Sequence, residues 1–417
     1  MNDEIKTRIE AVRRGEVPEG YLRTRAGIMP ADWPVQTLAK DVFKSYTNKK
    51  HGGAFEVLSA TQDRGIIPRS EVDIDIKYDE ENISSYKKVD KGDFVISLRS
   101  FQGGIEYSEY EGLVSPAYTI LKAIQPINDN YYRAYFKTAD FIKRLNGAVY
   151  GIRDGKQIGF EDFGDLAIHY PPLAEQQKIA EILSTCDRVI ELKQQLLDEK
   201  RKQKQWLMRS LLSKAQAINE IKLSDLCSLI CDGDWIESKD QSESGIRLVQ
   251  TGNVGIGQYL DKGGRARYIS EETFDKLHCT EIFEGDVLIS RLPDPIGRAC
   301  RIPKLSTRAI TAVDCSILRF KDEQIAEFFL QYATSQDYFN KIAILAGGST
   351  RTRISRKEIE KLTVPVPADK SSLVAVSVKL SLADREILLL EQELEAWQKK
   401  KKALMQLLLT GLVRVNA

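Results

Sequence analysis

CDRVIELKQQLLDEKRKQKQWLMRSLLS, residues 186–213, is followed 197 residues later by a similar stretch, ADREILLLEQELEAWQKKKKALMQLLLT, residues 383–410. Matched positions in the first stretch are Asp187, Arg188, Ile190, Leu197, Leu207, Met208, Leu211 and Leu212. Around the second stretch, a seam of residues alternates by three and four positions, which is the pattern of a coiled coil. This seam consists of Leu373, Val376, Leu380, Ala383, Ile387, Leu390, Leu394, Trp397, Lys401, Leu404 and Leu408.

The same register in the first stretch includes Lys193, Lys200 and Lys204, so this copy of the seam is more polar. Lysine stems can lie along an apolar seam while the ammonium reaches water, so we expect weaker packing there. A helix of about forty residues would be roughly 60 Å long, more than the width of a domain of about 150 residues. Each helix therefore needs a partner beyond its own domain. The sequence predicts that the two helices pair antiparallel and act as a spacer.

Two further pairs of segments repeat in the same order. KGDFVISLRS from Lys91 matches EGDVLISRLP from Glu284, and IGFEDFGDLAIHYPPL from Ile158 resembles ISRKEIEKLTVPVP from Ile354. Because the offsets of 193 and 196 residues are close to that of the helices, the chain is a tandem duplication. The predicted fold class is α+β, with two similar mixed α/β domains and a pseudo-twofold repeat. The predicted domains are residues 1–170 and 216–366, and the predicted spacer helices are residues 171–215 and 367–417.

The composition is that of an ordinary globular protein, with 417 residues, 42% of them hydrophobic and 29% charged. The charged opening MNDEIKTRIE and the lack of a run of about 18 apolar residues predict a cytoplasmic protein without a membrane span. Lys and Arg number 61 against 60 Asp and Glu, so any nucleic-acid site must depend on local charge. Of six cysteines only Cys227 and Cys231 lie close together, and we expect no metal site.

Arginines gather around the second Gly-Asp segment. Only one acid, Asp294, lies among the basic residues between Arg291 and Arg308, and the run GGSTRTRISRKEIEK from Gly347 adds arginines beside a glycine loop. Arginine can bind guanine in a bidentate way, and small hydroxyls and loop amides hold phosphate. The alternative, that these charges only form a solvated surface, stays open for each residue. The predicted DNA-binding residues are Lys49, Lys50, Arg64, Arg69, Arg99, Gln102, Arg153, Arg247, Asn253, Arg291, Arg298, Arg301, Ser349, Thr350, Arg351 and Arg353.

Motifs for catalysis are sparse. Asp75 and Lys77 have a spacing found in metal-dependent nucleases, but no further acid completes such a site. The glycines of TGNVGIG, residues 251–257, lack the third glycine and the strand-to-helix context of a methyl-donor or dinucleotide loop. No Asn-Pro-Pro-Tyr or Asp-Pro-Pro-Tyr motif occurs, and the three histidines have no recognisable partners. We therefore expect a non-enzymatic chain that binds no cofactor.

PPLAEQQKIAEIL at residues 171–183, GGSTRTRISRKEIEKLTVPVP at residues 347–367 and the repeated Gly-Asp segments closely resemble type I restriction-modification specificity subunits. The resemblance spans nearly the whole chain, and PPLAEQQKIAEIL, followed by Asp187, is its most specific part. The second copy departs from this pattern, because VPVPADKSSLVAVSV at residues 364–378 has no Glu-Gln pair. Its contacts with partners are therefore expected to differ.

The resemblance implies a function. Each globular domain would be a target-recognition domain that reads one half of a split, asymmetric site in double-stranded DNA, and the helices would set the gap. Two modification (methyltransferase) subunits would carry S-adenosylmethionine and methylate adenine. Restriction (translocase and nuclease) subunits would use ATP and magnesium. The chain itself would bind none of these cofactors and no membrane.

Two other functions stay open at this point. The first is a coiled-coil scaffold that joins two protein-binding domains without touching DNA, which the near-zero net charge favours. The second is the specificity chain of a related system whose methyltransferase and nuclease are fused.

Overall fold

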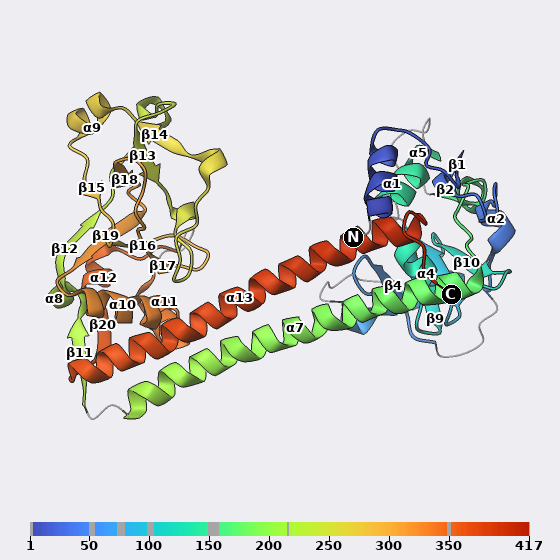
Figure 1. Ribbon diagram of the computed structural model, residues 1–417. Helices are drawn as coiled ribbons and strands as arrows, with labels where there is room; N and C mark the ends of the chain where they lie inside the picture. Colours follow the sequence, from blue (N-terminus) through green and yellow to red (C-terminus); the bar gives the residue numbers. More distant parts are fainter. Residues whose placement is uncertain are drawn as a thin grey trace. The chain divides into compact units, whose positions relative to one another are not determined.

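The computed structural model describes residues 3–49, 55–72, 80–97, 104–148, 158–214, 217–347 and 352–416. It divides into two compact units (Figure 1). Unit 1 consists of residues 1–193 and 393–417, and unit 2 of residues 194–392. No helix among the described residues is both long enough and apolar enough to span a membrane.

Two long helices, α7 (Leu173–Lys214) and α13 (Lys370–Leu409), each contribute to both units (Figure 1). In unit 1 the first part of α7 packs against the last part of α13, with Leu183 and Leu408 in one buried cluster. In unit 2 the last part of α7 packs against the first part of α13, with Met208 beside Leu380. These pairings confirm the antiparallel coiled coil predicted from the spacing of the apolar residues.

The lysines of the seam are paired with acids of the opposite helix. In unit 1, Lys193 Nζ lies 2.6 Å from Glu393 Oε2. In unit 2, Lys200 Nζ lies 2.7 Å from Glu386 Oε1. From the sequence alone, these lysines were expected only to weaken the packing. Their partners become apparent only once the register of the two helices is known.

Unit 1 is built on a four-stranded antiparallel sheet in the order β3-β10-β7-β8. Aromatic side chains form much of its core. Phe43 of β3 packs against Tyr132 of helix α4 and against Phe136, which follows that helix. The elements of unit 1 before α7 are α1 (Asp3–Arg13), β1 (Tyr21–Thr24), β2 (Gly27–Pro30), α2 (Ala39–Val42), β3 (Phe43–Tyr46), β4 (Leu58–Thr61), β5 (Gly65–Pro68), β6 (Lys87–Val89), β7 (Phe94–Ile96), β8 (Glu106–Tyr107), β9 (Gly112–Val114), β10 (Thr119–Ala123), α4 (Asp129–Tyr135), α5 (Ala139–Ala148) and α6 (Phe160–Gly164).

Unit 2 repeats this plan with a sheet in the order β12-β19-β16-β17 and adds a second sheet, β14-β13-β18-β15. The same strand order in both units agrees with the duplication seen in the sequence. The elements of unit 2 between the long helices are β11 (Ile218–Lys222), α8 (Leu223–Leu226), β12 (Cys227–Asp232), β13 (Ile246–Val249), β14 (Arg267–Ile269), α9 (Glu271–Leu277), β15 (Glu281–Ile282), β16 (Val287–Ser290), β17 (Ala299–Arg301), β18 (Ala309–Thr311), β19 (Cys315–Phe320), α10 (Glu323–Tyr332), α11 (Gln336–Leu345), α12 (Arg356–Lys361) and β20 (Thr363–Pro367).

The repeated Gly-Asp pair forms the turn that starts the central strand of each main sheet. Gly92 has a φ of 99° and Gly285 a φ of 95°, in the left-handed region that favours glycine. The carboxylate of Asp93 accepts the backbone N–H of Asp90 at 2.9 Å, and that of Asp286 accepts the N–H of Phe283 at 2.9 Å. The motif is therefore a structural feature that starts β7 and β16.

Candidate nucleic-acid interface

Two strands of the main sheet in unit 2 end at the same edge. Because β12 and β16 both pair antiparallel with β19, they run parallel to each other, and the register places Asp232 beside Ser316 and Ser290 beside Cys315. The residues that follow both strands therefore leave the sheet at the start of β19. We name this region the Cys315 edge, consisting of Asp232, Arg291, Asp314, Cys315 and Arg353.

Both arginines of the Cys315 edge are paired with acids. Arg291 Nη1 lies 2.7 Å from Asp232 Oδ1, and Arg353 Nη2 lies 2.9 Å from Asp314 Oδ1. Gly347 and Arg353 exchange backbone hydrogen bonds of 2.9 and 3.1 Å. The predicted residues between them, Ser349, Thr350 and Arg351, lie outside the described residues.

Two of the predicted arginines in unit 2 are buried and bound to backbone carbonyls. Arg298 is 9% exposed, and burial lowers the pKa of its guanidinium. It donates to the carbonyl oxygens of Val254 at 2.6 Å, Thr251 at 3.0 Å, Pro295 at 3.0 Å and Leu292 at 3.1 Å. Arg291 donates to the carbonyl oxygens of Ile354 at 3.1 Å and Val313 at 3.2 Å. Both side chains hold loops in place, and their contact with DNA stays a prediction.

The other predicted residues of unit 2 also have internal contacts. Arg301 forms ion pairs with Glu323 and Glu327. The side chain of Asn253 accepts the N–H of Gln250 at 3.0 Å and donates to the carbonyl of Leu260 at 2.9 Å. Arg247 is buried with its guanidinium over the ring of Tyr268, and its Nη1 has no hydrogen-bond partner among the described residues. The DNA contacts of these residues also stay predictions.

Unit 1 has an equivalent edge, because β3 and β7 flank β10 and place Tyr46 and Val95 on either side of Ile120. Lys49 follows β3. Arg64 lies before β5 and donates to the backbone oxygen of Glu71 at 2.8 Å, and Arg69 begins the turn that contains Glu71. The structure therefore places Arg64 in the turn of the β4–β5 hairpin and Arg69 directly after β5, at the other end of the hairpin. The predicted residues Lys50, Arg99, Gln102 and Arg153 lie outside the described residues.

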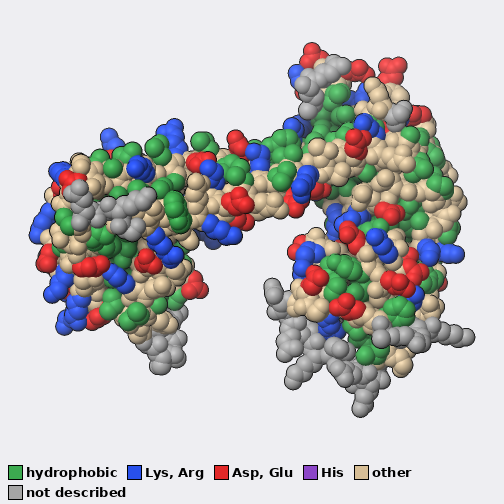
Figure 2. Space-filling model, turned by 90° about the horizontal axis from the view of Figure 1, so that it is seen from below, with side chains coloured by type: hydrophobic (Ala, Val, Ile, Leu, Met, Phe, Trp, Pro, Cys, Tyr) green, Lys and Arg blue, Asp and Glu red, His purple; other side chains and the backbone are tan. Residues whose placement is uncertain are grey.

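The charges on the surface are mixed rather than uniformly basic. On the face drawn in Figure 2, Lys and Arg side chains are interspersed with Asp and Glu on both units, among the side chains coloured there. This agrees with the net charge of +1. That face therefore presents no uniformly basic patch, and contact of the predicted residues with DNA stays a prediction.

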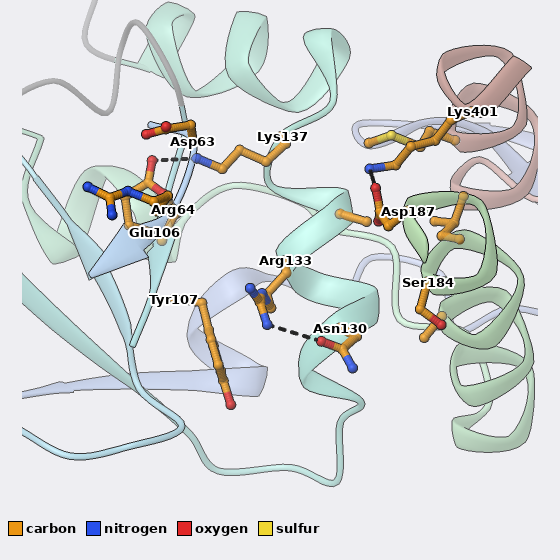
Figure 3. A pocket seen from close by; sticks show the side chains of 16 residues that line it. Asp63, Arg64, Glu106, Tyr107, Asn130, Arg133, Lys137, Ser184, Asp187 and Lys401 are labelled. Atoms are coloured by element: carbon orange, nitrogen blue, oxygen red, sulfur yellow. Dashed lines mark hydrogen bonds and ion pairs between the residues drawn. The ribbon is translucent and has the colours of Figure 1, made fainter. Parts of the chain in front are cut away.

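A cavity of about 500 Å³ lies inside unit 1, between the globular part and the two long helices (Figure 3). Glu106 and Lys137 form an ion pair on one side of it, and Asp187 and Lys401 form another on the side of the helices. Glu106 is 3% exposed, and burial raises the pKa of its carboxyl to about 7. The predicted residue Arg64 also lines this cavity.

A larger residue stands at the corresponding position of unit 2. Ala134, which lines the cavity of unit 1, corresponds to Gln331 at the helical offset of 197 residues. Gln331 Nε2 donates to Asp384 Oδ2 at 2.8 Å, and Lys204 Nζ contacts both Asp384 and Thr334. The lining of the cavity in unit 1 contains acids as well as bases. It gives no reason to place DNA there.

The Glu-Gln pair of PPLAEQQKIAEIL has a structural role in unit 1. Glu175 accepts Trp33 Nε1 at 2.9 Å and two hydrogen bonds from Arg414, at 2.8 and 3.0 Å. Gln176 accepts the N–H of Asn128 at 2.8 Å. Both side chains are buried, and the expected difference in partner contacts between the two copies stays a prediction.

The described residues contain no group of three or more His, Cys, Asp and Glu that could hold a metal ion. Burial raises the pKa of Cys227 to about 12 and also raises that of Cys231. Burial therefore disfavours the thiolate form that a nucleophilic cysteine needs. Asp75 and Lys77 lie outside the described residues.

Trp235, which is 69% exposed, is not among the residues predicted from the sequence. It follows Gly233 and Asp234, directly after β12 and close to the Cys315 edge. A signal was present in the sequence, because an aromatic residue follows a Gly-Asp turn at the end of an apolar run. The sequence does not show whether that ring is exposed.

Comparison with known proteins gives two matches to one family model. The model for the type I restriction modification DNA specificity domain matches residues 32–199 and 217–388. The two matched ranges correspond to the two copies of the repeat, and together they cover most of the chain.

Curated relatives and a solved structure agree with this match. The chain is 25% identical to the type I restriction enzyme MjaVIII specificity subunit of Methanocaldococcus jannaschii, over 79% of this chain and 80% of the relative. It is 26% identical to a putative type I restriction enzyme MjaX specificity subunit of the same organism, over 95% and 97% of the two chains. The crystal structure of a type I restriction-modification system S subunit from M. genitalium superposes with a TM-score of 0.52 and 13% identity, over 95% and 100% of the two chains. The last comparison concerns the fold alone.

Proposed function

The chain belongs to the type I restriction-modification specificity subunits, with two DNA specificity domains in tandem, and from this premise we propose that each unit reads one half of a split, asymmetric DNA site. The main observation in support of this proposal is that the two units contain equivalent sheets, β3-β10-β7-β8 and β12-β19-β16-β17. In both units the two strands that flank β10 or β19 end at the same edge. Two similar readers with different loop residues would read two different half-sites. As a specificity subunit, the chain is the non-catalytic component of its system.

A specificity subunit acts with DNA and with partner subunits. For this chain the partners would be two modification subunits, which bind S-adenosylmethionine, and restriction subunits, which use ATP and magnesium. Leu192 of α7 and Leu389 of α13 are related by the offset of 197 residues, and they suggest two equivalent docking positions for the two modification subunits. Their side chains are 47% and 53% exposed, although both lie on coiled-coil helices.

Mapping methylated adenines in a host that expresses the complete system would test the two-reader proposal. Arg353→Ala removes a cation at the Cys315 edge and should relax recognition at one half-site only, by about 1 to 3 kcal/mol if a base contact is lost. Lys49→Ala, after β3 at the equivalent edge of unit 1, is the matched variant and should relax recognition at the other half-site only. Equal relaxation of both half-sites by Arg353→Ala would contradict the assignment of one unit to one half-site.

A protein-binding scaffold that touches no DNA, which the near-zero net charge left open, does not agree with the match to two DNA specificity domains. A gel shift with the co-purified modification subunit separates the two functions. The scaffold predicts no sequence preference at any salt concentration, whereas a reader retains a preferred sequence as salt weakens all binding. The purified chain alone should neither methylate nor cleave DNA, and methyl transfer by the chain free of partner would contradict the proposed role.

A further inference from the structure

Trp235 presents a large aromatic ring to solvent beside the Cys315 edge. Its side chain is 69% exposed, and its indole N–H makes a long hydrogen bond of 3.3 Å to Glu237 Oε1. Trp206, which is 64% exposed, lies on α7 rather than at this edge. An exposed indole ring becomes buried only when it packs against an apolar surface or another π system.

The backbone that leads to Trp235 is held firmly. A Cβ atom on Gly233 would lie 2.4 Å from the carbonyl oxygens of both Thr311 and Ala312, so only glycine fits at this position. Asp234 donates its backbone N–H to Thr311 at 2.8 Å and accepts the N–H of Val313 at 2.9 Å. Its carboxylate also accepts the N–H of Thr280 at 2.9 Å. The ring is therefore presented by a fixed support, which limits the conformational entropy lost when it binds.

This support connects directly to the predicted DNA-reading residues. Val313 is followed by Asp314, whose carbonyl oxygen accepts the N–H of Arg291 at 2.9 Å and whose carboxylate pairs with Arg353. Trp235 and Arg353 are thus both connected to one short segment, residues 311–314. The acids of the edge are neutralised by these arginines, so they add little repulsion toward a phosphate backbone.

We propose that Trp235 is a DNA-contacting residue of unit 2, whose indole ring stacks on a base or packs on a deoxyribose of the half-site read by that unit. Aromatic rings stack on bases of any sequence, and they also serve as wedges between base steps. The contact would strengthen binding and place the neighbouring arginines on the base edges. This inference rests on the proposed function, in which unit 2 reads DNA.

The test is DNA binding by the complex of the full chain with its modification subunits. The probe is a fluorescein-labelled duplex that carries the site mapped from wild-type methylation, and fluorescence anisotropy gives the Kd. Trp235→Ala should raise this Kd by about 5- to 100-fold, as expected for loss of one base stack. Trp235→Phe keeps a ring and should stay within about threefold of the wild type, and it also controls for folding. Trp206→Ala is the matched control and should change nothing.

The outcomes separate the proposal from the function on which it rests. An unchanged Kd for Trp235→Ala, with a wild-type complex that prefers the mapped site, would overturn the role of Trp235 alone. Loss of modification-subunit binding by Trp235→Ala, with an unchanged DNA affinity of the remaining complex, would show a protein contact and would also overturn it. A wild-type complex without any sequence preference would instead contradict the proposed function.

Discussion

Lys204 Nζ lies 2.5 Å from Asp384 Oδ1, and the same ion pair occurs again at the positions related by the repeat, between Lys401 and Asp187. Each pair joins α7 to α13, one in unit 2 and the other in unit 1. Because a buried or half-buried polar pair at a coiled-coil seam is satisfied in only one register, these residues specify how the two helices align. The side chain of Lys204 is only 11% exposed, so its charge depends on this partner.

Reversing the charge of Lys204 tests this role in alignment. Lys204→Glu places two carboxylates together and should lower the free energy of unfolding by about 1 kcal/mol or more. The double variant Lys204→Glu with Asp384→Lys restores opposite charges and should recover most of the loss. Urea unfolding of the four proteins of this cycle gives the coupling energy. A coupling energy of zero would show that the pair does not contribute to alignment.

Ala134, which lines the cavity of unit 1, and Gln331 of unit 2 occupy positions related by the repeat. Ala134→Gln in unit 1 copies Gln331 of unit 2, so it should fill part of the cavity and raise the thermal midpoint. Gln331→Ala removes the 2.8 Å hydrogen bond to Asp384 and should destabilise the chain by about 1 kcal/mol. Differential scanning fluorimetry of both variants checks these opposite signs. Destabilisation by both substitutions would mean that the two sites differ in more than this residue.

Stability should depend on pH through His169. Burial lowers the pKa of His169 from its ordinary value of 6.5 to about 4, even though its ring nitrogens face the carbonyls of Leu409 and Ala26. The unfolded chain therefore takes up a proton more readily than the folded chain between these two values. Stability should be complete above about pH 6.5 and should fall by about 3 kcal/mol as the pH drops toward 4.

Urea unfolding at pH 7 and at pH 5 measures this effect. His169→Gln removes the titrating ring and should reduce the difference between the two pH values. His278→Asn is the matched control, because His278 is exposed and has a φ of 53°, which asparagine tolerates. An equal pH dependence in wild type and His169→Gln would show that other groups account for it.

Arg298→Lys distinguishes a structural arginine from a phosphate contact. The substitution keeps the positive charge, but an ammonium cannot serve the four carbonyl oxygens that the guanidinium binds. We expect a loss of about 2 to 4 kcal/mol in stability and a changed half-site for unit 2. Arg301→Lys should have a smaller effect, because Arg301 pairs with side-chain carboxylates that lysine can also reach. Normal stability with weakened DNA binding in Arg298→Lys would favour a direct phosphate contact.

The large features of this chain were predictable because they follow from periodicity. The three-and-four spacing around Leu380 and Leu394 predicted α13, and the repeated Gly-Asp pair predicted equivalent strands at Phe94 and Val287. The contacts that each arginine makes could not be predicted from the sequence. Arg298 and Arg353 look alike in the sequence, but whether a guanidinium meets carbonyls or solvent depends on tertiary packing. Trp235 was missed for the same reason, since its exposure depends on the strand beside Gly233.

The last prediction concerns the spacer. Lys193 pairs with Glu393 and Lys204 with Asp384, so a matched insertion must enter α7 between the two lysines and α13 between the two acids. Seven added residues in each helix preserve the heptad and add about 10 Å, which corresponds to roughly three base pairs of DNA. We expect the unread gap to lengthen by about three base pairs while both half-site sequences stay the same. Sequencing the methylated sites of the variant measures the gap.

An insertion in α7 alone is the control, because it shifts Lys204 away from Asp384 and should destabilise the chain. An unchanged gap with full activity, or altered half-sites, would show that the helices do not set the distance.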